Sequence, residues 1–294
     1  MLESKKRLIL LQHCRGLGWN SINLILLDDP LLDRIFQKKL ADWAVLLPHL
    51  THPNLSLFFH DLHSLNISSF LKKYSENHIF IISIFDTEYP QRLRNIFNPP
   101  WILFCKGNIL LLKEKRFLAV VGPRVPSVYG QEAVKRLMPG LISEKIVIIS
   151  GLAKGIDRMA HEAAIMQSGG TVAVLGGGLF HLYPKENMPL ALQMMKEQLV
   201  LSEIVPDRRP EPWMFPLRNR IISGLSDGVL IIEAKGRSGS LITAHAALEQ
   251  GRGVFAVPGP INSPLSEGTN LLIQDGAKLV QSSCDIEEEL FPLA

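Results

Sequence analysis

The chain has 294 residues, of which 47% are hydrophobic and 20% are charged, and its formal net charge is +3. This length allows one large domain and a smaller one, and the composition excludes disordered and collagen-like proteins. The net charge is too small to identify a nucleic-acid-binding protein, so only the local placement of arginine and lysine is informative.

Neither a disulfide framework nor a metal site is expected. The three cysteines, Cys14, Cys105 and Cys284, lie far apart in the sequence, and none has the spacing of metal ligands. The apolar run Leu8–Leu11 is too short for a signal peptide, and no segment reaches the length that crosses a bilayer. We therefore expect a soluble, cytoplasmic protein that needs no metal ion or cofactor and does not contact a membrane.

The first 75 residues predict a small all-helical domain. They contain only two of the 22 glycines, and short amphipathic helices are expected at Lys5–Cys14, Ser21–Leu27, Leu31–Leu47 and Leu62–Tyr74. Residues 10–18, followed by Ile22, resemble a helix-hairpin-helix element, which contacts a DNA backbone through amides; an ordinary helical turn has the same pattern. We expect residues 1–75 to be SAM-like or helix-hairpin-helix-like.

From residue 76 onward the pattern changes to apolar strands that alternate with helices. Strands are expected at Ile79–Ile84, Trp101–Phe104, Phe117–Val121, Ile146–Ser150, Thr171–Leu175, Leu199–Ser202, Val229–Glu233 and Gly253–Val257. Helices are expected at Tyr129–Met138, Asp157–Gln167, Asn187–Gln198 and Ser240–Gln250. This alternation is typical of a mostly parallel sheet covered on both faces, so residues 76–282 predict a doubly wound α/β domain. Residues 283–294 are expected to form a short C-terminal tail.

The first candidate binding element follows the strand that ends at Val121. Gly122 would let a ligand approach the backbone, and Arg124 stands where a bidentate contact with a phosphate is available. A tight turn whose arginine is merely solvated explains the same residues equally well.

The next strand is followed by Gly151 and a helix that contains Asp157 and His161. The amides at Ser150 and Gly151 are expected to be free, while Asp157 is placed to cap the helix. No second histidine or cysteine accompanies His161, so we expect it to be structural, with a hydrogen bond to Asp157 or to a neighbouring loop.

A run of three glycines, Gly176–Gly178, follows the strand expected at Thr171–Leu175. It resembles a dinucleotide-binding fingerprint, but His181 occupies the position of the required third glycine. We therefore expect a glycine-lined shelf for a phosphodiester or a base, with Lys185 as a point charge at its rim.

Residues 215–220 combine an aromatic ring, a proline and two arginines ahead of a helix-like segment at Ile221–Leu225. Phe215 with Arg218 and Asn219 is the combination that binds unpaired nucleotides with little regard to sequence. In the alternative interpretation, Phe215 is a core residue and one of the arginines, Arg218 or Arg220, pairs with Glu203 or Glu233.

Two further segments remain open between a functional and a structural interpretation. Ser238, Gly239 and Ser240 form a turn at a helix start that suits an anion, although Ser240 could simply cap the helix. The apolar run Leu271, Leu272 and Ile273 is a candidate dimer contact, and as part of a core it would look the same.

Taken in order, these motifs resemble the DNA-processing protein A family of bacteria, DprA, also called Smf. The resemblance covers roughly residues 78 to 280, and its densest stretches are 120–124, 150–157, 174–178, 215–225, 237–244 and 257–259. It implies an extended Rossmann-like domain that binds single-stranded DNA without reading its sequence, and it implies no enzymatic activity. It also implies protection of incoming DNA, delivery of RecA onto that strand in natural transformation, and a homodimer.

By motif position, the resemblance assigns DNA binding to Arg124, Lys185, Phe215, Arg218 and Asn219, with the turns at Gly122 and at Ser238–Ser240 lining the pocket. The chain departs from the family at Pro123, where serine is common, and in lacking room for the winged-helix-like domain that many members carry at the C-terminus.

An enzymatic alternative is a Rossmann-like nucleotide-sugar hydrolase that cleaves nucleoside monophosphates. Such enzymes also place a glycine-rich phosphate turn and acidic residues at a strand end. Their Pro-Gly-Gly-x-Gly-Thr turn is replaced here by residues 237–243, with the sequence Arg-Ser-Gly-Ser-Leu-Ile-Thr.

Overall fold

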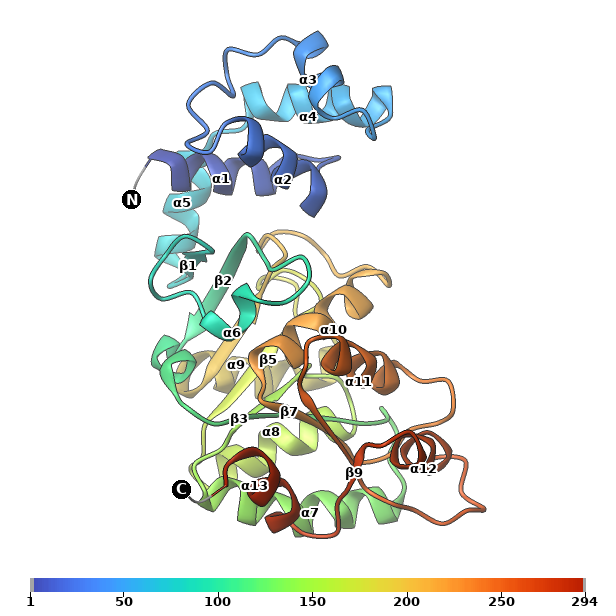
Figure 1. Ribbon diagram of the computed structural model, residues 1–294. Helices are drawn as coiled ribbons and strands as arrows, with labels where there is room; N and C mark the ends of the chain where they lie inside the picture. The colour runs from blue at the N-terminus through green and yellow to red at the C-terminus, as the bar shows by residue number, and fades with distance from the viewer. Residues whose placement is uncertain (1–2, 293–294) are drawn as a thin grey trace. The chain divides into compact units, whose positions relative to one another are not determined.

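The computed structural model describes residues 3–292, which belong to two compact units (Figure 1). The first unit comprises the residues up to Asp86 together with Pro100–Leu103, and the second comprises Thr87–Pro99 and the residues from Phe104 onward. The division thus falls at Asp86, eleven residues beyond the predicted boundary at residue 75. The outermost ends of the predicted segments, residues 1–2 and 293–294, lie outside the described residues.

Two contacts explain why the first unit extends past its helices. Lys5 Nζ donates to the carbonyl oxygen of Ile81 at 2.9 Å and forms an ion pair with Asp86. The indole of Trp101 donates to the carbonyl oxygen of Trp19 at 3.2 Å, and the two rings stack with centroids 5.0 Å apart. These bonds hold residues 80–86 and 100–103 to the first two helices.

The first unit consists of five helices and one short strand, among the residues that the structure describes. They are α1 (Glu3–His13), α2 (Trp19–Asp28), α3 (Leu40–Leu46), α4 (His52–Ser64), α5 (Ile67–Glu76) and β1 (Phe80–Ser83). Their buried side chains include Trp43 and Phe58, whose rings meet edge to face at 5.0 Å.

Two of the predicted helices in this unit are wrong in extent. The helix expected from residue 31 begins only at Leu40, because Leu32 is buried with a left-handed φ of 58° and interrupts the helical backbone. The helix expected across 62–74 is two helices, since the side chain of Asn66 caps α5 by accepting from Ser69 N at 3.3 Å. Pro53 lies in the first turn of α4, where the missing N–H costs nothing.

A short turn joins α1 and α2, as the sequence predicts. Gly16 adopts a φ of +83°, and a Cβ there would lie 2.8 Å from the carbonyl oxygen of Asn54. Arg15 is held by Asp61, which accepts from its backbone N and its Nε, each at 2.9 Å, and from Nη2 at 2.7 Å. Whether this turn contacts DNA stays a prediction.

The second unit alternates strands with helices. Its elements are α6 (Gln91–Arg94), β2 (Ile102–Gly107, from Phe104), the 3₁₀ helix η1 (Ile109–Lys113), β3 (Phe117–Val121), α7 (Val128–Ser143), β4 (Val147–Ser150), α8 (Ile156–Met166), β5 (Thr171–Val174), the 3₁₀ helix η2 (Lys185–Asn187), α9 (Met188–Glu197), β6 (Leu199–Ser202), α10 (Met214–Leu225), β7 (Gly228–Ile231), α11 (Gly239–Glu249), β8 (Gly253–Ala256), α12 (Glu267–Gln274), β9 (Lys278–Leu279) and α13 (Cys284–Leu290).

The strands of this unit form a mostly parallel sheet with the order β2-β6-β5-β4-β3-β7-β8-β9. Strand β2 is antiparallel to β6, with Phe104 opposite Ser202, and the other neighbours are parallel. The strand order runs in opposite directions on the two sides of β3, which is the Rossmann-like arrangement. The predicted fold class is thereby confirmed.

Helices cover both faces of the sheet (Figure 1). Helices α7 and α8 pack through Leu141 and Ala160 on Leu118 and Leu230, while α10 and α11 pack on the opposite side against β3 and β7. The segment predicted as a short tail contributes α13, whose Ile286 is fully buried in the same cluster as Leu141. Alternating residues of each strand therefore face two separate layers of helices.

Helix α10 is longer than the sequence indicates. It begins at Met214 and includes residues 215–220, which were expected to precede a helix starting at Ile221. Pro216 lies in the first turn of this helix, where proline is compatible with the helical backbone. Phe215, Arg218 and Asn219 are consequently held on a rigid element.

Candidate functional site

The loops that follow β3, β4, β5 and β7 lie at one edge of the sheet. These four strands are neighbours and run parallel, so their carboxyl ends meet there. The order of the strands reverses between β3 and β7, and such a switch point leaves a crevice beside the carboxyl ends. Nine predicted DNA-binding residues all follow or face these strand ends.

This edge carries exposed positive charges without partners. Among residues 3–292, five cationic side chains on the segments after β3, β5, β6 and β7 are exposed and make no hydrogen bond or ion pair: Arg124, Lys185, Arg209, Lys235 and Arg237. Two neighbouring cations are neutralised, since Lys154 pairs with Glu186 at 2.5 Å and Arg208 with Glu211 at 2.9 Å. The free charges are available to an anionic ligand.

Arg218 is buried at the centre of the edge. Its Nη1 donates to the carbonyl oxygen of Gly151 at 2.7 Å and to that of Val174, and its Nε donates to Asn219 Oδ1 at 3.1 Å. Burial, opposed by the charge of Asp157 and reinforced by the weaker effect of Arg124, lowers the pKa of Arg218 to about 10. Arg218 therefore ties the ends of β4 and β5 to α10.

Arg124 and the start of α11 are connected to this centre. Arg124 lies within electrostatic range of Arg218, and its backbone rests on Gly155, where a Cβ would come within 2.7 Å of the Arg124 carbonyl. Asn219, which binds Arg218, donates through Nδ2 to the carbonyl oxygen of Gly239 at 3.3 Å. The structure thus brings together Arg124 from the loop after β3, Arg218 and Asn219 from α10, and Gly239 at the start of α11.

Asp157 is occupied by the loop that precedes its helix. Its Oδ2 accepts from the backbone N of Gly151 at 3.1 Å and of Ala153 at 3.4 Å. The prediction that the amide of Gly151 is free is therefore wrong, and the N-cap of α8 is Gly155. Burial raises the pKa of Asp157, and the charge of Arg218 opposes that rise.

His161 is a buried structural residue, as predicted, but its partner is Thr171. The Thr171 hydroxyl donates to the carbonyl oxygen of Ile148 at 2.8 Å, so it accepts from His161 Nδ1, which lies 2.7 Å away. Nδ1 therefore carries the proton, and Nε2 is buried without a partner among the described residues. Burial, with a smaller contribution from Arg218, lowers the pKa of His161 to about 3.

The glycines of Gly176–Gly178 accommodate the protein's own chain. A Cβ at Gly176 would lie 2.8 Å from the ring of Phe215, one at Gly177 would lie 2.8 Å from Pro210, and one at Gly178 would meet the carbonyl oxygen of Val205 at 2.3 Å. The expected open shelf for a ligand is therefore wrong, because residues 205–215 cover it.

Gly122 has a comparable explanation. A Cβ at this position would lie 2.5 Å from the side chain of Ile156, at the start of α8. The absence of a side chain is thus required by helix packing, independently of any ligand.

Phe215 and Tyr183 form an aromatic pair beside these glycines. Their ring centroids are 5.8 Å apart, and their planes are inclined at 55°. Phe215 is half-buried, Tyr183 is 50% exposed, and the exposed Lys185 follows Tyr183 after one residue. The guanidinium of Arg124 and the ring of Phe215 accordingly belong to the same edge of the sheet.

The start of α11 differs from the prediction in its capping residue. Ser238 is the N-cap, although its side chain makes no capping bond, and its Oγ is buried without a partner among the described residues. Gly239 is exposed, whereas Ser240 is 8% exposed and lies inside the helix.

The alternative interpretation of the two arginines holds for Arg220. Its Nη2 pairs with both carboxylate oxygens of Glu203, at 2.7 and 2.8 Å, in a nearly buried site. Glu233 is bound instead by Ser127, whose backbone N donates to it at 3.0 Å.

The candidate dimer residues lie on α12. Leu271 is 46% exposed, Leu272 is 6% exposed and Ile273 is half-buried. Leu272 is thus part of the unit's own core, and Leu271 is the residue of the three that is exposed for a contact with another chain.

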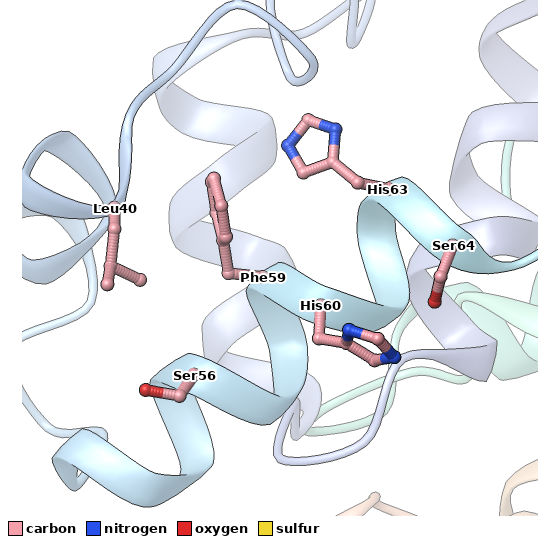
Figure 2. Close-up of a pocket in the computed structure, with 6 residues that line it drawn as sticks. All are labelled: Leu40, Ser56, Phe59, His60, His63 and Ser64. Atoms are coloured by element: carbon pink, nitrogen blue, oxygen red, sulfur yellow. The ribbon is translucent and has the colours of Figure 1, made fainter.

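The first unit contains a separate groove that the sequence did not indicate. Its volume is about 500 Å³, and it is lined by Leu40, Ser56, Phe59, His60, His63 and Ser64. Figure 2 shows Phe59, His60 and His63 projecting from α4, and the rings of Phe59 and His63 meet at 4.7 Å.

Residues 3–292 contain no group of three or more histidine, cysteine, aspartate or glutamate side chains that could hold a metal ion. No helix in this range is both long and apolar enough to cross a membrane.

The sequence interpretation missed Arg209, Lys235, Arg237 and Tyr183 as candidate site residues. Each lies on a loop that follows a predicted strand, so their positions after strand ends were a usable signal. Their exposure and lack of partners could not be read from the sequence.

The fold and the site define a Rossmann-like α/β protein with a basic edge. A family model described as DNA recombination-mediator protein A matches residues 80–291. The DNA processing protein DprA of Bacillus subtilis is 49% identical over 220 residues, which cover 75% of this chain and 74% of the relative. DprA of Streptococcus pneumoniae is 51% identical over 207 residues, covering 70% and 73%. The chain therefore belongs to the DNA recombination-mediator protein A family.

Two solved structures are similar. The X-ray structure of DprA from Streptococcus pneumoniae has a TM-score of 0.85 and 41% sequence identity, and the match covers 97% of this chain and 98% of that one. DNA processing protein A from Helicobacter pylori, which binds single-stranded DNA, has a TM-score of 0.65 and 29% identity, covering 72% and 96%.

The buried His161 generates a prediction about acid stability. Below about pH 6.5 an unfolded chain protonates this histidine, whereas the folded protein resists protonation until about pH 3, so acidification through this range should lower the free energy of unfolding. We expect His161→Asn, which keeps a donor for Thr171, to flatten this dependence. Denaturant unfolding of both proteins between pH 7.5 and pH 4.5 measures it.

A lower stability of His161→Asn at every pH is compatible with this account. Parallel pH profiles of the variant and the wild type would contradict it.

Proposed function

We propose that this protein binds single-stranded DNA without regard to sequence. The supporting observation is the set of five exposed cations at the carboxyl edge of the sheet, none of which has a partner within residues 3–292, beside the aromatic pair Phe215 and Tyr183. Cations that track a backbone, together with rings that stack on bases, bind any unpaired strand because every base has a π-face.

The predicted residues divide into two roles. Arg124 and Lys185 are exposed and capture phosphates, and Phe215 lies at or near a stacked base. Arg218 and Asn219 hold the edge together, because their polar atoms are engaged with Gly151, Val174 and Gly239. The exposed Gly239 and the unpartnered Ser238 hydroxyl line the neighbouring turn.

We propose further that the protein acts without catalysis. The acidic residues at this edge are committed to structural contacts: Asp157 to two amides, Glu203 to Arg220 and Glu233 to Ser127. A hydrolase of nucleoside monophosphates needs a carboxylate that reaches its substrate. Release of free base from a nucleoside monophosphate would contradict this proposal.

In the cell, the protein would protect incoming single strands in the cytoplasm during natural transformation and help to load RecA onto them. Membership in a family described as recombination mediators supports this role. A homodimer is the proposed assembly, with the exposed Leu271 at or near the contact.

Removal of Arg124 should weaken binding to every single strand. Arg124→Ala should reduce the slope of log K against log salt concentration by about 0.7, the contribution of one phosphate on a single strand. Titrations of single- and double-stranded oligonucleotides of several sequences across ionic strengths measure this slope.

Lys115→Ala is the matched control, because Lys115 is also exposed and precedes β3 at the opposite edge of the sheet. It should leave the affinity and the slope near the wild-type values. An unchanged slope and affinity in Arg124→Ala would overturn the assigned site.

The mediator role can be measured separately. On single strands coated with a single-strand-binding protein, the wild type should accelerate the onset of RecA ATPase activity, and Arg124→Ala should not, because it no longer holds the strand. Lack of acceleration by a wild-type protein that binds the strand would refute RecA loading while leaving DNA binding in place.

The proposed dimer predicts a change of mass. Leu271→Arg places a charge on the exposed face of α12 without disturbing the buried Leu272, so it should shift the protein from dimer to monomer in light scattering. Glu267→Arg, on the same helix, checks whether charge alone has this effect. A dimer that persists in Leu271→Arg excludes Leu271 from the interface.

A further inference from the structure

One side of the Phe215 ring is closed by the protein itself. A Cβ at Gly176 would lie 2.8 Å from Cδ1 and 3.1 Å from Cε1 of this ring, so the ring rests directly on the glycine backbone. Phe215 is also only half-exposed as a whole. A base therefore has limited access to it.

Tyr183 presents the more open ring of the pair. It is 50% exposed, and its ring meets that of Phe215 at a centroid distance of 5.8 Å. Because the two planes are inclined at 55°, they form a corner, and a flat base cannot be sandwiched between them. A base can instead stack on the outer side of Tyr183.

The segment that carries Tyr183 is fixed to the sheet edge. Pro184 is buried, and Asn187 Nδ2 donates to the carbonyl oxygens of Leu152 and Ala153, both at 2.9 Å. These bonds attach residues 184–187 to the loop that follows β4. The Tyr183 ring is thus held in place before any ligand binds, which limits the entropy lost on binding.

A cation stands next to this ring. The ammonium group of Lys185 is exposed and has no hydrogen-bond or ion-pair partner among the described residues, while the neighbouring Glu186 is neutralised by Lys154. A ring and a free ammonium group two residues apart match the two parts of a nucleotide, its base and its phosphate.

We propose that Tyr183 is the platform on which an unpaired base stacks, and that Phe215 supports Tyr183 from the side of the sheet. This inference rests on the proposed binding of single-stranded DNA. It adds a contact that depends on bases to the phosphate contacts of Arg124 and Lys185.

The test compares two ligands of equal charge, an oligothymidylate and an abasic oligonucleotide of the same length, at one ionic strength. Tyr183→Leu should weaken binding of the oligothymidylate by roughly five-fold to a hundred-fold, the range for loss of one stacked base. It should leave binding of the abasic strand and the salt slope unchanged. Tyr183→Phe should restore the wild-type affinity.

Phe97→Leu is the matched control, because Phe97 is an 83% exposed aromatic residue on the loop after α6. It should bind both strands as the wild type does. Equal losses for both strands in Tyr183→Leu would show a structural role and overturn the inference, as would an unchanged affinity for the oligothymidylate. A wild type that binds both strands equally would overturn the inference alone. A wild type that binds neither would overturn the proposed function as well.

Discussion

The buried guanidinium of Arg218 connects the parts of the candidate site. Its Nη1 donates to the carbonyl oxygen of Gly151, after β4, and to that of Val174, at the end of β5. Its Nε donates to Asn219 on α10. The buried guanidinium is stabilised by these hydrogen bonds, and the charge of Asp157 opposes the lowering of its pKa by burial. The geometry of the edge therefore depends on the hydrogen bonds of Arg218.

Buried and exposed charges at the edge of the sheet differ in whether they have partners within the protein. Buried or nearly buried charges, such as Arg218, Asp157, Arg220 and Glu203, have protein partners, whereas the loop cations remain free in the described structure. Free cations at the surface cost little, since water solvates them, and they gain binding energy when they release counterions from a polyanion. The same edge thus combines a rigid buried network with a surface open to a charged ligand.

Backbone packing decides several features that resemble binding motifs in the sequence. Gly122, Gly151 and Gly176 each lie against another side chain of the protein, namely Ile156, Arg218 and Phe215. A glycine required by close packing cannot be distinguished in the sequence from a glycine required by a ligand. Only the identity of the atom that a Cβ would meet separates the two cases.

The sequence by itself determined the alternation of apolar strands and helices, and hence the doubly wound class, because burial on both faces demands continuous apolar strands. It also placed Arg124, Phe215 and Lys185 after or near strand ends. It misplaced helix limits where single residues decide, as at Leu32, Asn66 and Pro216. Only the tertiary structure decided which arginine is buried and paired. It also decided which glycines pack against other side chains, and that the ring of Tyr183 is exposed. These properties depend on contacts between residues far apart in the chain, such as Gly151 with Arg218, and local sequence patterns carry no record of those distances.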